Sequence, residues 1–255
     1  MPDDHREEFA FLLANGYLGA RTGHYFAHLS QPVGVWNYLR IADEIVRQLP
    51  HGVLLDWGCG YGQMTYLLRR RGLHVTPYDI GALDANMPDL PLCRGLSIVR
   101  NMHPTQLPFP DQSFDAVLSC GVLEHVDEHS APGNEIRSLH EIARILRPGG
   151  KLLIYQLPQR DAWQEALLRR LKRGYTHPQR YTATTITALL ARTGFRVTDL
   201  KRANMLPKNL TGVPGWARGI YNAGSRAVLS TDVVLCRVPL LNQLAGVLEL
   251  SAIRV

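Results

Sequence analysis

The chain has 255 residues, of which 45% are hydrophobic and 20% charged, a composition typical of a globular protein with a full core. Its net charge of +6 favours anionic partners without selecting one, and a solvated basic surface is the ordinary explanation. Its four cysteines lack C-x-x-C spacing, and no signal peptide or membrane-spanning run is visible, so a cytoplasmic location without disulfides or a zinc site is expected.

Residues 1–50 are predicted to be mostly helical. A short apolar face around Phe9 and Leu12 is followed by Gly16, Gly19 and Gly23, which we expect to break the helix. A stronger amphipathic pattern predicts a helix over residues 35–49, ended by Pro50.

Residues 53–68 carry the strongest local signal. The apolar run Val53–Leu55 predicts a buried parallel strand that Asp56 closes, and Gly58, Gly60 and Gly62 turn the chain into a helix over 63–71. N–H groups that open such a helix favour the negative part of a ligand, so this is a predicted nucleotide site. It is not a P-loop, because no Lys-Ser/Thr pair follows, and Gln63 replaces the third glycine of the dinucleotide fingerprint.

Asp79 is predicted to end the second strand, 17 residues after Gly62. An acidic side chain in that place can accept both ribose hydroxyls of an adenosine ligand. Residues 82–96 are predicted to form a loop, and a third strand is expected at 97–99.

The remaining chain continues the alternation of strands and helices. A fourth strand is predicted at 114–119, and its carboxyl end, Cys120 to His125, should face the ligand crevice. Asn134 is the expected cap of the next helix, and Thr184 or Thr185 the expected cap of the last one. Further strands are predicted at 151–156, 195–200 and 247–255, and a helix with a basic end at 163–173.

Four motifs, DWGCGYG, LPFPDQSFD, LEHV and LRPGG, occur in this order between Val53 and Pro158. Together they closely resemble the class I S-adenosylmethionine (SAM)-dependent methyltransferases, in particular the UbiE/UbiG-like (methyltransferase type 11) small-molecule branch. The resemblance implies an α/β fold: a Rossmann-like αβα sandwich with a seven-stranded, mostly parallel sheet whose last strand is antiparallel. It also implies a division into an N-terminal helical segment over the cofactor (1–50), a SAM-binding core (51–202), a cap insertion at the substrate site (203–246) and the last strand (247–255).

The same resemblance implies SAM as cofactor and S-adenosylhomocysteine as product. Asp56 and the glycine loop would hold the methionine part, Asp79 the ribose, and the run from Asn101 to His103 the adenine. Because the family commonly has Asp where His103 stands, Asn101 or a backbone carbonyl would make the adenine contact. The residues expected at the cofactor are Asp56, Trp57, Gly58, Cys59, Gly60, Gln63, Asp79, Ile80, Asn101, Met102, His103 and Cys120.

His125 is the candidate base if the acceptor is a hydroxyl, because the unperturbed pKa of imidazole lies near neutrality. Glu124 is the second candidate, and the alternative is that His125 merely packs at the start of a helix. UbiG-like enzymes that use a metal carry a second acidic residue three positions before the one that corresponds to Glu124 here. Gly121 stands there in this chain, so no metal is expected.

The segment 203–246 interleaves apolar residues with Lys208, Arg218, Arg226 and Arg237. A helical cap of this composition suits a lipid-linked or amphiphilic acceptor or shallow contact with an anionic membrane, and a dimer face or ordinary packing is the alternative. The leading hypothesis is therefore a SAM-dependent methyltransferase of a small or lipid-linked molecule. A NAD-dependent oxidoreductase, a non-catalytic methyltransferase-fold protein and an RNA methyltransferase are the alternatives, although no appended RNA module or aromatic basic stripe supports a nucleic-acid partner.

Overall fold

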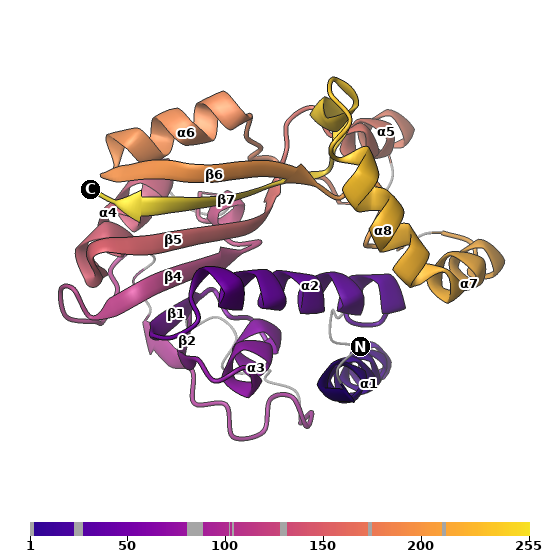
Figure 1. Ribbon diagram of the computed structural model, residues 1–255, viewed down its shortest axis with the longest axis horizontal. Helices are drawn as coiled ribbons and strands as arrows, with labels where there is room; N and C mark the ends of the chain where they lie inside the picture. Colours follow the sequence, from indigo (N-terminus) through magenta and orange to yellow (C-terminus); the bar gives the residue numbers. More distant parts are fainter. Residues whose placement is uncertain are drawn as a thin grey trace.

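The computed structural model describes residues 3–22, 28–80, 89–101, 103, 105–127, 132–172, 175–210 and 213–255 (Figure 1). A seven-stranded sheet with the order β3-β2-β1-β4-β5-β7-β6 forms the centre. Its strands are β1 Val53–Trp57, β2 His74–Ile80, β3 Val99–Asn101, β4 Phe114–Cys120, β5 Leu146–Pro158, β6 Phe195–Ala203 and β7 Val247–Arg254.

The sheet confirms the predicted fold class. Strands β1 to β5 pair in parallel, and β7 runs antiparallel to both β5 and β6. The strand order reverses at β1, which lies between β2 and β4, so the crevice at the carboxyl ends of these strands is a topological switch point.

Helices cover both faces of the sheet. Residues of α1, α2 and α3 share one buried apolar cluster with one face, and residues of α4 and α6 share a second cluster with the other face. Helices α5, α7 and α8 lie beyond the carboxyl ends of the parallel strands, at the right of Figure 1. The α-helices are α1 Asp3–Arg21, α2 Pro32–Gln48, α3 Gln63–Arg70, α4 Asn134–Ile145, α5 Trp163–Leu171, α6 Ala183–Arg192, α7 Gly215–Ala223 and α8 Ser225–Leu235, and two 3-10 turns are η2 Leu123–His125 and η3 Leu241–Leu244.

The predicted glycine break near the N-terminus is wrong, because α1 runs unbroken through Gly16 and Gly19. A Cβ added to Gly16 would lie 2.3 Å from the carbonyl carbon of Leu29. This glycine therefore permits close packing of α1 against the chain that enters α2. That second helix begins at Pro32, three residues before the predicted start, because proline is well suited to the first helical position.

Several element boundaries also differ from the predictions. The third strand begins at Val99, two residues late, and the fifth at Leu146, five residues early. The N-cap of α6 is Thr182, which forms a reciprocal capping box with Thr185. At α4, Gly133 rather than Asn134 is the N-cap, and the Asp127 carboxylate accepts hydrogen bonds from N–H groups at the helix start.

Between β6 and β7 the chain forms α7, α8 and η3, so the segment expected to form a helical cap does contain helices, while its place over a substrate site stays a prediction. Helix α8 packs against α2. Among the described residues, no helix combines the length and the hydrophobicity needed to span a bilayer.

Candidate functional site

The glycine loop follows β1 directly. Gly58, Gly60 and Gly62 all have left-handed backbone angles, with φ of +74°, +53° and +84°. An added Cβ would lie 2.5 Å from the side chain of Val122 at Gly58 and 2.3 Å from that of Leu96 at Gly62, whereas at Gly60 it would meet no atom of the described residues within 4 Å. Packing therefore requires the outer two glycines, while Gly60 presents its backbone to open space that a ligand can enter.

Asp79 holds this loop from the end of β2. Its Oδ2 accepts a hydrogen bond from the Gly60 N–H at 2.7 Å, and its Oδ1 accepts one from the Ile80 N–H at 2.8 Å. Burial raises the pKa of Asp79, although the two N–H donors act in the opposite direction. Each carboxylate oxygen has a further lone pair, so the side chain can anchor the loop and still accept a ligand hydroxyl.

Asp56 lies beneath the loop rather than in it. Its carboxyl is 2% exposed and accepts a hydrogen bond from the Thr65 hydroxyl at 2.6 Å, which joins the end of β1 to α3. Burial raises the pKa of Asp56 to about 6. Trp57 and Cys59 are also buried, so both expected cofactor residues shape the loop mainly through packing and backbone.

Tyr38 of α2 is buried, and its phenol lies near the side chain of Gln63, the first residue of α3. Among the described side chains none hydrogen bonds with Gln63 Oε1, although this atom is buried. An acceptor in this position can be satisfied by a ligand N–H or hydroxyl. Sequence reasoning missed Tyr38. Its only signal in the sequence is that it is an aromatic residue with a polar hydroxyl in the helix before the first strand.

Asn101 uses its side chain locally at the opposite side of the loop. Its Nδ2 donates to the Gln106 carbonyl at 2.7 Å, and its Oδ1 accepts from the His103 N–H at 3.1 Å. The side chain of His103 in turn accepts from the Thr105 N–H. Backbone groups are therefore better placed than the Asn101 amide to contact an adenine, and Met102 lies outside the described residues.

Beyond β4, the turn η2 carries Glu124 and His125. The Glu124 carboxylate is 2% exposed and the His125 imidazole 41%, and their Oε1 and Nε2 atoms lie 3.8 Å apart. The ring of His177 is centred 5.6 Å from that of His125, and its Nδ1 hydrogen bonds with Glu165. A carboxylate on one ring nitrogen orients an imidazole and fixes its tautomer, so His177 is a second candidate base. Sequence reasoning missed Glu165.

The same cluster could hold a metal. Glu124, His125 and His177 each offer one ligand atom, and these atoms lie within 4.8 Å of one another. Two imidazoles and a carboxylate suit a divalent transition metal. In the sequence, Gly121 in place of a second acidic residue indicates that no metal is bound. The fold, however, adds His177 to the cluster as a further ligand group. The expected absence of a metal therefore stays a prediction.

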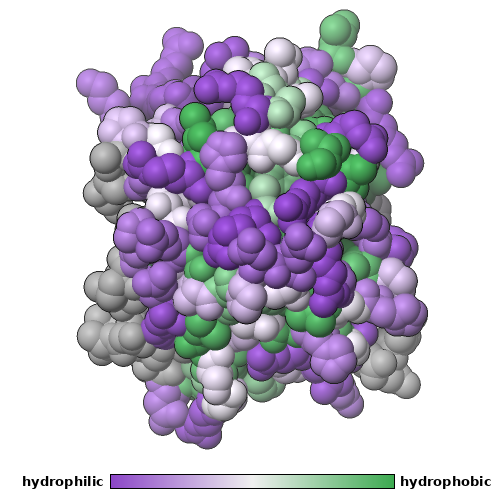
Figure 2. Space-filling view, turned by 90° about the vertical axis from the view of Figure 1, so that its left-hand side faces the viewer, coloured by the Kyte–Doolittle hydropathy of each residue, from purple (hydrophilic) through white to green (hydrophobic). Residues whose placement is uncertain are grey.

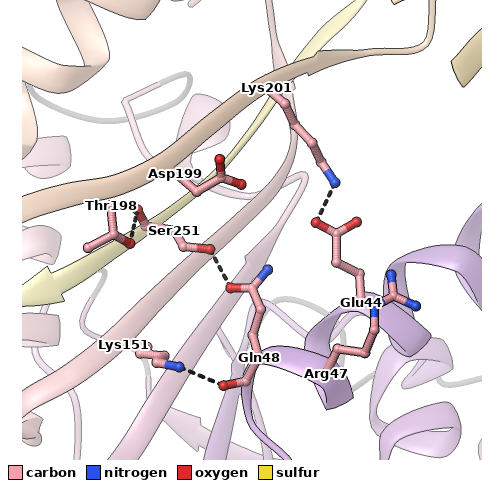
Figure 3. Close-up of a pocket in the computed structure, with 8 residues that line it drawn as sticks. All are labelled: Glu44, Arg47, Gln48, Lys151, Thr198, Asp199, Lys201 and Ser251. Atoms are coloured by element: carbon pink, nitrogen blue, oxygen red, sulfur yellow. Dashed lines mark hydrogen bonds and ion pairs between the residues drawn. The ribbon is translucent and has the colours of Figure 1, made fainter. Parts of the chain in front are cut away.

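A polar cavity of about 460 Å³ lies at the other end of the sheet, between the last turn of α2 and strands β5, β6 and β7 (Figure 3). Its lining groups pair across the gap: Lys151 donates to the Gln48 carbonyl, Ser251 donates to the Gln48 side chain, and Lys201 forms an ion pair with Glu44. These contacts attach α2 to the sheet, and we assign the cavity to that structural junction.

Residues 18–200 match the family model described as "Methyltransferase domain". Over 136 residues the chain is 34% identical to a probable tRNA methyltransferase 9B of Bos taurus, a match that covers 52% of this chain and 27% of that protein. It is 34% identical over 126 residues to a fatty-acid O-methyltransferase of Mycolicibacterium smegmatis, covering 45% of this chain and 41% of that one. The matches thus span less than half of these curated relatives.

Solved structures share the fold at low identity. A SAM-dependent methyltransferase of Thermotoga maritima, described as a possible histamine N-methyltransferase, has a TM-score of 0.57 at 16% identity, with 95% of this chain and 98% of that chain covered. The 1,6-didemethyltoxoflavin-N1-methyltransferase of Burkholderia thailandensis, solved with S-adenosylhomocysteine bound, has a TM-score of 0.53 at 19% identity, with 98% and 89% covered.

Proposed function

This chain belongs to the methyltransferase-domain family, for which SAM is the methyl donor, and on that premise we propose that it methylates a small-molecule, lipid-linked or amphiphilic acceptor. The observation that supports SAM binding is the open space over Gly60, between the Asp79 carboxylate and the start of α3. SAM supplies a methyl group on a sulfonium sulfur, so the protein chiefly has to align the acceptor and exclude water.

The residues around that space fit the cofactor. Asp79 would accept the ribose hydroxyls, and the backbone at Gly60 would lie against the methionine part. The buried Oε1 atom of Gln63 offers a further polar contact. His125, or His177 oriented by Glu165, would remove the proton of a hydroxyl acceptor.

The acceptor class is supported by the relatives rather than by the cofactor site. Besides the fatty-acid O-methyltransferase, they include a demethylmenaquinone methyltransferase of Tropheryma whipplei at 30% identity and a phthiotriol/phenolphthiotriol dimycocerosates methyltransferase of Mycobacterium ulcerans at 37%. These names favour the UbiE/UbiG-like branch with an apolar acceptor. The probable tRNA methyltransferase 9B relatives favour a second candidate, methylation of tRNA.

One assay separates the two candidates without a known acceptor. The purified protein is incubated with SAM labelled in its methyl group, once with a cellular lipid extract and once with total tRNA. We expect label in the organic phase and none in the tRNA. Label in the tRNA alone would contradict the proposed acceptor class and support methylation of tRNA instead. Label in neither fraction, together with no SAM binding, would contradict the methyltransferase function.

Replacing Gly60 with alanine is expected to weaken SAM binding by about tenfold to a hundredfold, because the new methyl group enters the cofactor space (overpacking costs about 1–3 kcal/mol). Gly72 provides the matched control: it also has a positive φ, +86°, and in the described part of the chain no atom lies within 4 Å of a Cβ added there. Gly60→Ala and Gly72→Ala should lower the melting temperature by similar amounts. Titration calorimetry with SAM should detect a loss of affinity in Gly60→Ala only. Equal affinities in the two variants would place the cofactor elsewhere.

His125→Ala is expected to lower the rate of label transfer by about a hundredfold or more while SAM affinity is retained, because the imidazole acts on the acceptor proton. Glu165→Gln should lower the rate less, since it affects only the orientation of His177. EDTA should leave the rate unchanged. A rate abolished by EDTA and restored by Mn²⁺ would instead assign Glu124, His125 and His177 to a metal.

A further inference from the structure

Exposed apolar side chains gather at one end of the molecule. Apart from Ile80 at the end of β2 and Val255 at the chain end, the large exposed hydrophobic residues of the described chain lie on α1, α5, α7, α8, η3 and the segments joined to them. The opposite side of the molecule, which Figure 2 shows, is dominated by hydrophilic residues. The apolar end is also the end where the parallel strands stop and the crevice opens (Figure 1).

Two helices at this end contribute no residue to the hydrophobic core. Neither α5 nor α7 has a fully buried residue, although α5 carries Trp163, Leu167 and Leu171, and α7 carries Trp216 and Ile220 at i, i+4 spacing. Trp216 is 75% exposed and Ile220 70%. Because helices of nine residues are marginal in water without a packed apolar face, these two helices are suited to meeting a second apolar phase.

The exposed charges on α5 and on the segment 203–246 are of one sign. Residues 163–172 contain three basic residues and one acidic residue, and residues 203–246 contain four basic and one acidic. Both acidic side chains are largely buried and paired, Glu165 with His177 and Asp232 with Lys208 at 3.1 Å. The exposed charges of these two segments are therefore all cationic: Arg169, Arg170, Lys172, Arg218, Arg226 and Arg237.

We propose that α5, α7, α8 and η3 form a docking face for an anionic lipid bilayer. The exposed apolar side chains enter the boundary between headgroups and acyl chains, and the basic residues pair with lipid phosphates. A second copy of this chain fits the face less well, because self-association would bring two sets of positive charges together. Docking in this orientation turns the crevice toward the bilayer, so an apolar acceptor enters it from the lipid phase. Only this last step rests on the proposed function.

The test is flotation of the full chain with vesicles of phosphatidylcholine, with and without phosphatidylglycerol. We expect binding to the anionic vesicles that high salt weakens. Trp216→Asp should reduce the bound fraction by at least about tenfold, whereas Val255→Asp, at an equally exposed position (75%) at the other end of the sheet, should not. Arg218→Glu should likewise weaken binding, with Arg196→Glu on β6 as its control.

Three outcomes would overturn the docking face: no binding to anionic vesicles, equal losses in Trp216→Asp and Val255→Asp, or a dimer in light scattering that Trp216→Asp dissociates while vesicles bind nothing. Calorimetry with SAM on the same samples separates the two proposals. Protein that binds SAM but not vesicles contradicts only the docking face, and protein that binds vesicles but not SAM contradicts only the proposed function.

Discussion

Replacing Asp79 with alanine is expected to weaken SAM binding by about a hundredfold or more. The variant loses the acceptor for two backbone donors, Gly60 N–H and Ile80 N–H, and with it the anchor of the glycine loop. A hydrogen bond to a charged group contributes about 1.5–3 kcal/mol, and the proposed ribose contacts would be lost as well. Titration calorimetry with SAM and S-adenosylhomocysteine measures the effect.

Asp79→Asn separates the two roles of this side chain. Its carbonyl oxygen can still accept from Gly60 N–H, so the loop should keep its conformation, while the charge and one acceptor are lost. We expect an affinity between those of wild type and Asp79→Ala, with a melting temperature close to that of wild type. If Asp79→Ala binds SAM as well as wild type, the ribose contact and the cofactor space over Gly60 are both wrong.

Ionisation of Asp56 is expected to cost the folded protein about 3 kcal/mol. Its pKa in the folded state is about 6, above the ordinary value of 3.8, because the buried carboxyl loses its hydration. A raised carboxyl pKa means that the unfolded chain ionises first. The contribution of protonated Asp56 to the free energy of unfolding is therefore fully present below about pH 3.8 and is lost as the pH rises through 6.

Asp56→Asn tests this titration directly. The amide oxygen can still accept from the Thr65 hydroxyl, so the variant removes the charge and keeps the hydrogen bond. Urea unfolding should show a variant that is similar to wild type near pH 4 and more stable by up to about 3 kcal/mol at pH 8. A difference in free energy of unfolding that does not change with pH would contradict the buried, titrating carboxyl.

The sequence by itself determined the strand, glycine loop and helix of the proposed cofactor site. These elements are specified by neighbours in the chain: an apolar run, three glycines that need positive φ, and an acidic residue at the end of the next strand. The alternation of strands and helices also predicted the individual strands and helices, because each segment has its own hydrophobic period. The seven-stranded sheet with its antiparallel last strand was implied by the resemblance to the class I methyltransferases.

Tertiary structure alone decided which distant side chains meet. Packing of α2 on α3 brings Tyr38 to Gln63, and the chain after α5 returns His177 to His125 with Glu165 behind it. The glycine at position 16 illustrates the same limit: its local signal was a break, but its role is contact with a segment that follows the helix. Such contacts depend on how whole elements pack, and their side chains leave no periodic or local pattern in the sequence.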